Sequence, residues 1–185
     1  MKFRVTKTIL VLLSLAVFAS GVFAQEGAVL KPSGKMTVQT NPEQDFMMKA
    51  AMGGMLEVQL GQLALKNASS PDVKRFAQRM VDDHSKAGDE LKSLAATKNV
   101  VLPAALSAKE QATIDRFSKL SGADFDREYM KAMVKDHDKD VGEFEKEARS
   151  AKDPDVKAWA EKTLPTLKEH QSMAHDIANK VSKKM

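Results

Sequence analysis

The chain has 185 residues, of which 29 are basic and 25 acidic, and it contains no cysteine. Without cysteine the protein can form neither disulfides nor thiolate metal ligands. Three of the basic residues and none of the acidic ones lie in the first 24 residues, so the remainder carries 26 basic against 25 acidic side chains. That near-neutral remainder gives no reason to expect nucleic-acid binding.

The first 24 residues have the pattern of a secretory signal peptide. A basic start with Lys2, Arg4 and Lys7 precedes an apolar run over 9–18, and a cleavage site follows that ends in Ala24. The apolar run is too short to cross a bilayer. We therefore expect cleavage after Ala24, export to a bacterial periplasm, and no membrane span in the mature protein.

Residues 25–43 are polar, contain glycine and proline and show no hydrophobic period, which predicts a flexible lead-in. The rest of the chain is rich in Ala, Leu, Lys, Glu and Met and lacks β-branched runs, which favours helix over strand. Apolar residues spaced three and four apart predict four long amphipathic helices. Their approximate ranges are 44–68, 71–97, 123–150 and 154–182.

The connection between the second and third predicted helices is longer than a hairpin loop. It covers about 98–122 and contains a short predicted helix that Ser107 opens, with Glu110 three residues later as in a capping box. Two helical hairpins joined by such a crossover form the plan of a ferritin-like bundle. We predict an all-α, ferritin-like four-helix bundle over 44–182.

Each long helix carries one side chain able to bind a metal near its middle, on the stripe predicted to be buried. These residues are Glu57, His84, His137 and His170. Polar groups in a core are costly unless they are paired or coordinated. Helices that span one bundle share a midpoint, so these four side chains should converge at one depth.

This combination of side chains leaves two interpretations open. Imidazole and carboxylate together suit one transition metal ion, such as zinc, iron, manganese or copper. In the other interpretation, Glu57 holds the histidines in a metal-free network of hydrogen bonds. The residue types alone do not separate the two.

Further polar residues flank these positions along the chain. Asp140 lies one turn from His137 and could be another ligand or could orient that histidine. Asp83 and Asp136 are expected to be solvated. His175 lies off the apolar stripe of its helix and is expected at the surface.

The methionines permit a second chemical hypothesis. Thioethers are soft ligands that suit Cu(I), but methionine is also an adaptable filler of hydrophobic cores, and we favour the packing role. The residues concerned are Met47, Met48, Met52, Met55, Met80, Met130, Met133 and Met173.

Four motifs, one for each long helix, carry a resemblance to a known family. They are Glu57, Phe76-Ala77-x-x-Met80-x-x-Asp83-His84, Phe125-Asp126-x-x-Tyr129-x-x-x-Met133-x-x-x-His137 and Leu164-Pro165-x-Leu167-x-x-His170. In these motifs the sequence resembles an exported bacterial ferritin-like family of unknown function, domain of unknown function 4142. The resemblance covers about 44–182 and implies a periplasmic four-helix fold, but no established activity.

The ferritin-like analogy has a gap at the metal site. Di-iron sites of that fold use a Glu from each of two helices and Glu-x-x-His from each of the other two. The positions three residues before the histidines hold Val81, Val134 and Leu167 instead. A di-iron oxidase or an iron-storage ferroxidase is therefore not expected, and a single metal fits better.

We therefore expect a non-enzymatic periplasmic binding or stress-related protein that holds one transition metal at the Glu/His cluster. One alternative is a structural or protein-interaction module with a metal-free polar core. Another is a mononuclear metal oxidoreductase, which needs an open coordination position and a path for substrate. The sequence identifies no protein partner and no oligomeric state.

Overall fold

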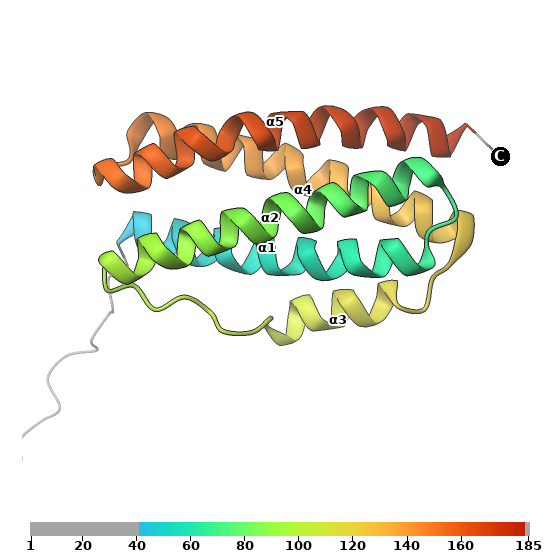
Figure 1. Ribbon diagram of the computed structural model, residues 1–185, viewed down its shortest axis with the longest axis horizontal. Helices are drawn as coiled ribbons and strands as arrows, with labels where there is room; N and C mark the ends of the chain where they lie inside the picture. Colours follow the sequence, from blue (N-terminus) through green and yellow to red (C-terminus); the bar gives the residue numbers. More distant parts are fainter. Residues whose placement is uncertain (1–40, 184–185) are drawn as a thin grey trace, which may run out of the picture. The chain divides into compact units, whose positions relative to one another are not determined.

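The computed structural model describes residues 41–183, so the predicted signal peptide and nearly all of the predicted lead-in lie outside the described residues. Within them the chain is all-helical, as predicted, and one isolated bridge between Ala68 and Gly122 is the only strand-like pairing. The helices are α1 (Pro42–Asn67), α2 (Pro71–Thr97), α3 (Ala108–Phe117), α4 (Gly122–Ser150) and α5 (Pro154–Ser182) (Figure 1).

The helices begin where the local sequence supplies caps. The Asn41 side chain accepts a hydrogen bond of 3.1 Å from the backbone N–H of Glu43, and Pro42 takes the first helical position. This cap places the start of α1 two residues before the predicted one. Asp153 caps α5 in the same way, by accepting hydrogen bonds from two backbone N–H groups of the first turn.

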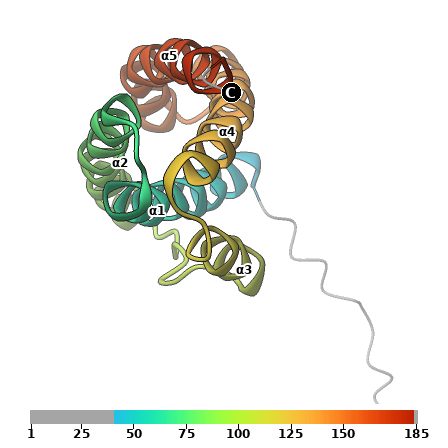
Figure 2. The ribbon, with the colours of Figure 1, turned by 90° about the vertical axis from the view of Figure 1, so that its right-hand side faces the viewer.

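The four long helices surround one interior, and α3 lies outside them (Figure 2). The hairpin partners, α1 with α2 and α4 with α5, make the most extensive contacts; α2 also packs on α5, and α1 on α4. Each helix of the ring is antiparallel to its neighbours, so in chain order the long helices run up, down, down and up (Figure 1). The connection that contains α3 therefore returns along the length of α1.

Polar contacts at both ends tie the two hairpins together. At one end, Asp126 of α4 accepts hydrogen bonds from the Ser69 N–H (3.0 Å), the Ser69 hydroxyl (2.5 Å) and the Ser70 N–H (2.9 Å). At the other end, Lys98 Nζ lies 2.7 Å from Asp153 and 2.6 Å from an aspartate of the first turn of α5. These contacts fix how far one hairpin can slide along the other.

The predicted apolar stripes are buried, and they form two hydrophobic clusters rather than one. One cluster lies towards the α1–α2 turn and includes Leu60, Phe76, Phe125, Met133 and Ala174. The other lies towards the α4–α5 turn and includes Phe46, Leu91, Phe144, Trp159 and Leu167. Along every long helix, the residue predicted to bind metal falls between the two clusters. Among the described residues, no helix is long and apolar enough to cross a membrane.

Candidate metal centre

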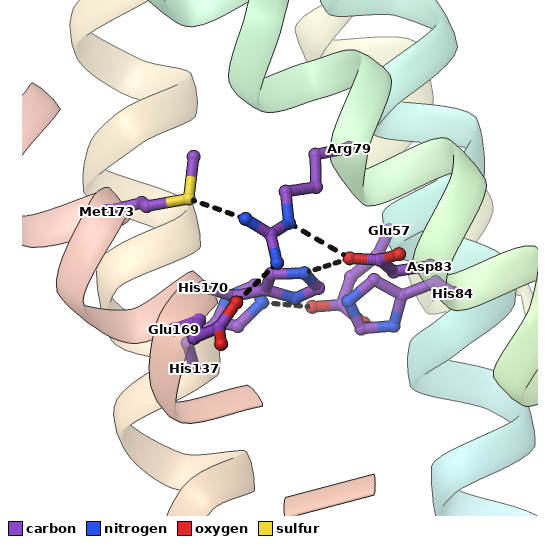
Figure 3. Close-up of polar contacts among 8 residues, drawn as sticks. All are labelled: Glu57, Arg79, Asp83, His84, His137, Glu169, His170 and Met173. Atoms are coloured by element: carbon purple, nitrogen blue, oxygen red, sulfur yellow. Dashed lines mark hydrogen bonds and ion pairs between the residues drawn. The ribbon is translucent and has the colours of Figure 1, made fainter. Parts of the chain in front are cut away.

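The structure brings the four predicted side chains together in the middle of the helical ring (Figure 3). Glu57 is 1% exposed, His84 8%, and His137 and His170 0%. The imidazole centroids lie 5.3 Å apart for His84 and His170, 5.4 Å for His137 and His170, and 5.7 Å for His84 and His137. The convergence expected from equal depth along the four helices is therefore present.

One ring nitrogen of each histidine in the cluster lies within hydrogen-bond distance of an oxygen acceptor. His137 Nδ1 lies 2.9 Å from the backbone carbonyl of Met133, one turn earlier on α4. His84 Nδ1 lies 2.9 Å from Glu57 Oε2, and His170 Nε2 lies 2.8 Å from Asp83 Oδ2. Because a carbonyl and a carboxylate only accept hydrogen bonds, each of these nitrogens donates its N–H. In a neutral imidazole the other nitrogen then carries a lone pair.

The remaining ring nitrogens have no hydrogen-bond partner. They are His84 Nε2, His137 Nε2 and His170 Nδ1, all buried. Ligand-capable nitrogens of the three histidines lie within 4.8 Å of one another. Histidines that bind metals in proteins donate their other N–H to a carboxylate or a backbone carbonyl, which fixes the tautomer and the ring direction. All three histidines show that arrangement.

One carboxylate oxygen of Glu57, beside these histidines, also lacks a hydrogen-bond partner. This oxygen, Oε1, accepts no hydrogen bond and lies 3.4 Å from His137 Nε2. Since His137 donates through Nδ1, its Nε2 lone pair faces this carboxylate oxygen, and two acceptors meet with no proton between them. A cation bound between them would satisfy both atoms.

The electrostatics keep Glu57 charged and two of the histidines neutral. Burial opposes the charge of Glu57, but the charge and hydrogen bond of His84 outweigh it and lower the Glu57 pKa. The same pair raises the pKa of His84, against the effect of burial. Burial lowers the pKa of His137, and it lowers that of His170 to about 4. His137 and His170 therefore hold free lone pairs at neutral pH.

A second layer of polar side chains holds His170 from outside (Figure 3). Arg79 Nε lies 3.1 Å from the Asp83 oxygen that contacts His170. The same guanidinium contacts Glu169 and donates to Met173 Sδ at 3.7 Å. These contacts link α2 to α5 beside the cluster. The sequence analysis missed Arg79, although its position one turn before Asp83 was a signal.

The prediction that Asp83 and Asp136 are solvated is wrong. Asp83 is bonded to His170 and Arg79 because α5 packs on α2 at this height. Asp136 is half-buried, and a carboxylate oxygen of each of Glu57, Asp136 and Asp140 lies within 4.8 Å of the others. Burial, followed by repulsion from Glu57, raises the pKa of Asp136 to about 6 and that of Asp140 to about 7. Asp140 thus lies beside the Glu/His cluster, next to Glu57.

A cavity of about 370 Å³ opens next to these carboxylates. Its polar lining includes Glu57, His84, Asp136 and Asp140. Its apolar lining includes Phe46, Leu91, Phe144, Trp159 and Leu167. The cavity gives solvent and small molecules a route to one side of the Glu/His cluster.

The remaining candidates serve mainly in packing and at the surface. Met47, Met80, Met130 and Met133 are buried in the hydrophobic clusters, which agrees with the packing role. On α1, Met55 lines the cavity. His175 is exposed, as expected, and its Nε2 lies 2.8 Å from Asp138 Oδ1.

A family model supports the resemblance noted in the sequence. It is described as Domain of unknown function (DUF4142), and it matches residues 30–177. The chain belongs to this family. The match confirms the resemblance stated from the four helix motifs, and it assigns no activity. A comparison with curated proteins finds no significant match.

Several solved structures have a similar helical fold, although their sequences are only 10–16% identical to this chain. A DUF305 fragment from Deinococcus radiodurans superposes with a TM-score of 0.66 at 12% identity, and the alignment covers 76% of this DUF4142 chain and 97% of that one. CopM in its Cu(II)-bound form gives a TM-score of 0.63 at 16% identity, covering 75% and 96%. A DUF305 protein from Streptomyces coelicolor gives 0.65 at 10% identity, covering 76% and 92%. At these identities the likeness concerns the fold.

Proposed function

We propose that this protein is an exported, ferritin-like four-helix bundle that binds one transition metal ion through Glu57, His84, His137 and His170. In this role the protein is a binding or stress-related protein rather than an enzyme. The observation that carries the proposal is that each of the three histidines has one buried ring nitrogen without a hydrogen-bond partner, in a group whose ligand-capable nitrogens lie within 4.8 Å of one another. The unpartnered Glu57 Oε1 lies 3.4 Å from one of these nitrogens, His137 Nε2.

A metal-free polar network accounts less well for these contacts. Buried polar atoms in native proteins nearly always have hydrogen-bond partners, and a half-satisfied network is costly. Here one N–H of each histidine is satisfied. The unpartnered Nε2 of His137, Nδ1 of His170 and Oε1 of Glu57 are acceptors, and two of them, His137 Nε2 and Glu57 Oε1, lie 3.4 Å apart. A cation at the centre would satisfy these acceptors.

The donor set suits several metals, and copper is the first to test. Three imidazoles and one carboxylate can bind zinc, iron, manganese or copper. The CopM structures with a similar fold contain Cu(I), Cu(II) or Ag. The proposed periplasmic location is a further reason to test copper first, because copper is handled in that compartment.

Metal analysis of the purified protein tests the proposal. The protein is exported natively and purified without chelator, and its metal content is measured beside His84→Ala/His170→Ala. We expect about one metal ion per chain in the wild type and none in the double variant. The exposed histidine variant His175→Ala is the matched control and should keep the metal. A wild-type protein that neither contains nor takes up zinc, iron, manganese or copper would refute the proposal.

Export is tested separately, by cell fractionation and mass spectrometry of the mature protein. The signal-peptide pattern supports a periplasmic protein whose first residue is Gln25. Recovery of the full chain, with Met1 still present, in the cytoplasmic fraction of the native host would contradict this part of the proposal.

The cavity favours one alternative function, a mononuclear metal oxidoreductase. It reaches Glu57 and His84 and supplies the substrate path that such an enzyme needs. Turnover of a redox dye or of peroxide by the metal-loaded protein, abolished in His84→Ala/His170→Ala, would support this activity. Metal binding without turnover would leave the binding role.

A further inference from the structure

Asp136, Asp140 and Glu57 bring three carboxylates together on the cavity side of the histidines. A carboxylate oxygen of each lies within 4.8 Å of the other two. Asp136 and Asp140 are one turn apart on α4, on either side of His137 along the chain, and Glu57 faces them from α1. Lys139 Nζ lies 3.6 Å from Asp140, but this lysine side chain is 61% exposed and is therefore well solvated.

A second observation, apart from this clustering, points to a bound ligand. Glu57 is 1% exposed, and its Oε1 has no hydrogen-bond partner even though Oε2 is bonded to His84. A buried carboxylate oxygen without a donor is costly. Glu57 belongs to the carboxylate group and also contacts two of the histidines, His84 through Oε2 at 2.9 Å and His137 through Oε1 at 3.4 Å. Its carboxylate can therefore bind a cation on either side.

We propose that Glu57, Asp136 and Asp140 form a second cation site, which takes a hard divalent ion such as Mn²⁺ and shares the Glu57 carboxylate with the transition-metal site. Carboxylate oxygens are the ligands that such ions prefer, and their remaining positions are usually filled by water. The adjoining cavity of about 370 Å³ admits that water. The two sites differ in chemistry, one rich in imidazole and the other in carboxylate. The shared ligand rests on the proposed function; the carboxylate site itself does not.

The missing Glu-x-x-His pattern does not argue against a two-metal centre of this kind. The sequence criterion searched for acids three residues before each histidine. In this chain the carboxylates stand one residue before and three residues after His137, at Asp136 and Asp140. The centre we infer is asymmetric, with the histidines on one side and the aspartates on the other.

Sequential loading tests the inference. The mature protein, freed of metal by a chelator, receives one equivalent of Zn²⁺ and is then titrated with Mn²⁺, whose free aqua ion is followed by EPR. We expect one Mn²⁺ per chain in addition to one Zn²⁺. In Asp136→Asn/Asp140→Asn, Mn²⁺ should bind at least about 100-fold more weakly, since even residues that only orient ligands contribute 10–100-fold. The same variant should keep its Zn²⁺.

Asp138→Asn is the matched control, because Asp138 lies between the two aspartates along α4 but contacts Gln171 and His175 outside the cluster. It should bind both ions. Replacing Zn²⁺ by Cu²⁺ reports distance: a neighbouring Mn²⁺ should broaden the Cu²⁺ EPR signal, and an unaltered signal would place Mn²⁺ elsewhere and overturn the inference.

The failures of the two proposals are distinguishable. Zinc bound without any Mn²⁺ uptake would overturn the second site and leave the transition-metal site. Mn²⁺ that binds to a protein unable to take up zinc, iron or copper, and that is lost in Asp136→Asn/Asp140→Asn but kept in His84→Ala/His170→Ala, would refute the transition-metal site and leave the carboxylate site. Circular dichroism of the aspartate double variant guards against misfolding, and we expect it to melt no lower than the wild type without metal, because it removes repulsion between neighbouring charges.

Discussion

The chemistry of this protein depends on which nitrogen of each buried histidine remains free. Met133 O, Glu57 Oε2 and Asp83 Oδ2 each accept an N–H from a different imidazole. The partner atoms thereby select the tautomers of the neutral histidines and determine which ring nitrogen of each histidine is left without a partner. Two of these partners are the carboxylates of Glu57 and Asp83, so a substitution at either position can disturb the proposed metal site by changing how a histidine is oriented.

Asp83→Ala should weaken metal binding without removing a ligand. The variant takes away the acceptor that holds His170 Nε2–H, so His170 can rotate or change tautomer. We expect a loss of about 10–100-fold in affinity, measured by competition with a chromophoric chelator. Asp82→Ala, which removes an exposed carboxylate bonded to Gln78, is the control and should bind as the wild type does. Equal affinities of the two variants would contradict this role for Asp83.

Asp140→Asn should stabilise the metal-free protein in a pH-dependent way. Burial, followed by the nearby charge of Glu57, raises the pKa of Asp140 from its ordinary value of 3.8 to about 7. A raised pKa means that the folded state binds the proton of Asp140 more tightly than the unfolded state does. The contribution of Asp140 to the free energy of unfolding is therefore fully present below about pH 4 and is lost as the pH rises through 7. In EDTA at pH 7.5 the variant should gain on the order of 2 kcal/mol. At pH 4 the gain should disappear. Urea unfolding at the two pH values measures the change, and an equal gain at both would show that the raised pKa of Asp140 is not its cause.

At the scale of the helices, close packing within each hairpin sets the positions from which the side chains act. Gly61 on α1 lies directly against α2. A Cβ added there would stand 2.9 Å from Val81 Cγ2 and 3.0 Å from the Ala77 carbonyl oxygen. The backbone oxygen cannot move aside as a flexible side chain can. The glycine therefore lets α1 approach α2 closely, one turn from Glu57.

Gly61→Ala should destabilise the protein by roughly 1–3 kcal/mol, because overpacking forces the two helices apart. Gly142→Ala is the matched control, since a Cβ at this exposed helical position would meet nothing within 4 Å. There the substitution should stabilise by roughly 0.5–1 kcal/mol through helix propensity. Urea unfolding measures both changes, and a neutral Gly61→Ala would show that the α1–α2 distance can relax.

At the scale of the whole ring, the proposed metal joins all four long helices. Each ligand comes from a different helix, and the cluster separates two hydrophobic clusters. An ion at this point would couple both halves of the interior and both hairpins. Without it, the unpartnered acceptors weaken the middle of the ring.

Metal should therefore raise the unfolding temperature in one cooperative transition. An ion present at about 1,000 times its Kd adds roughly 4 kcal/mol by mass action, which corresponds to about 10 °C for a domain of this size. Thermal melts with metal and with EDTA measure the shift. His175→Ala should keep the shift and His84→Ala/His170→Ala should lose it; a wild type indifferent to zinc, iron, manganese and copper would count against the site.

The sequence by itself determined the all-helical class, the five helices with nearly their observed bounds, and the four central residues. These follow from local physics: a 3–4 spacing marks the buried face of a helix, prolines and caps mark its start, and counting along each helix gives depth. Glu57, His84, His137 and His170 could be found because each interrupts an apolar stripe at the same depth.

Only the tertiary structure decided which atoms of those residues are free. The bond from Asp83 to His170 crosses from α2 to α5, and the grouping of Asp136 and Asp140 with Glu57 depends on how α4 is rotated towards α1. Helix rotation and spacing are set by the packing of side chains from all the helices at once. For that reason the sequence placed both Asp83 and Asp136 in solvent, whereas the fold turns one towards a histidine and the other towards a carboxylate.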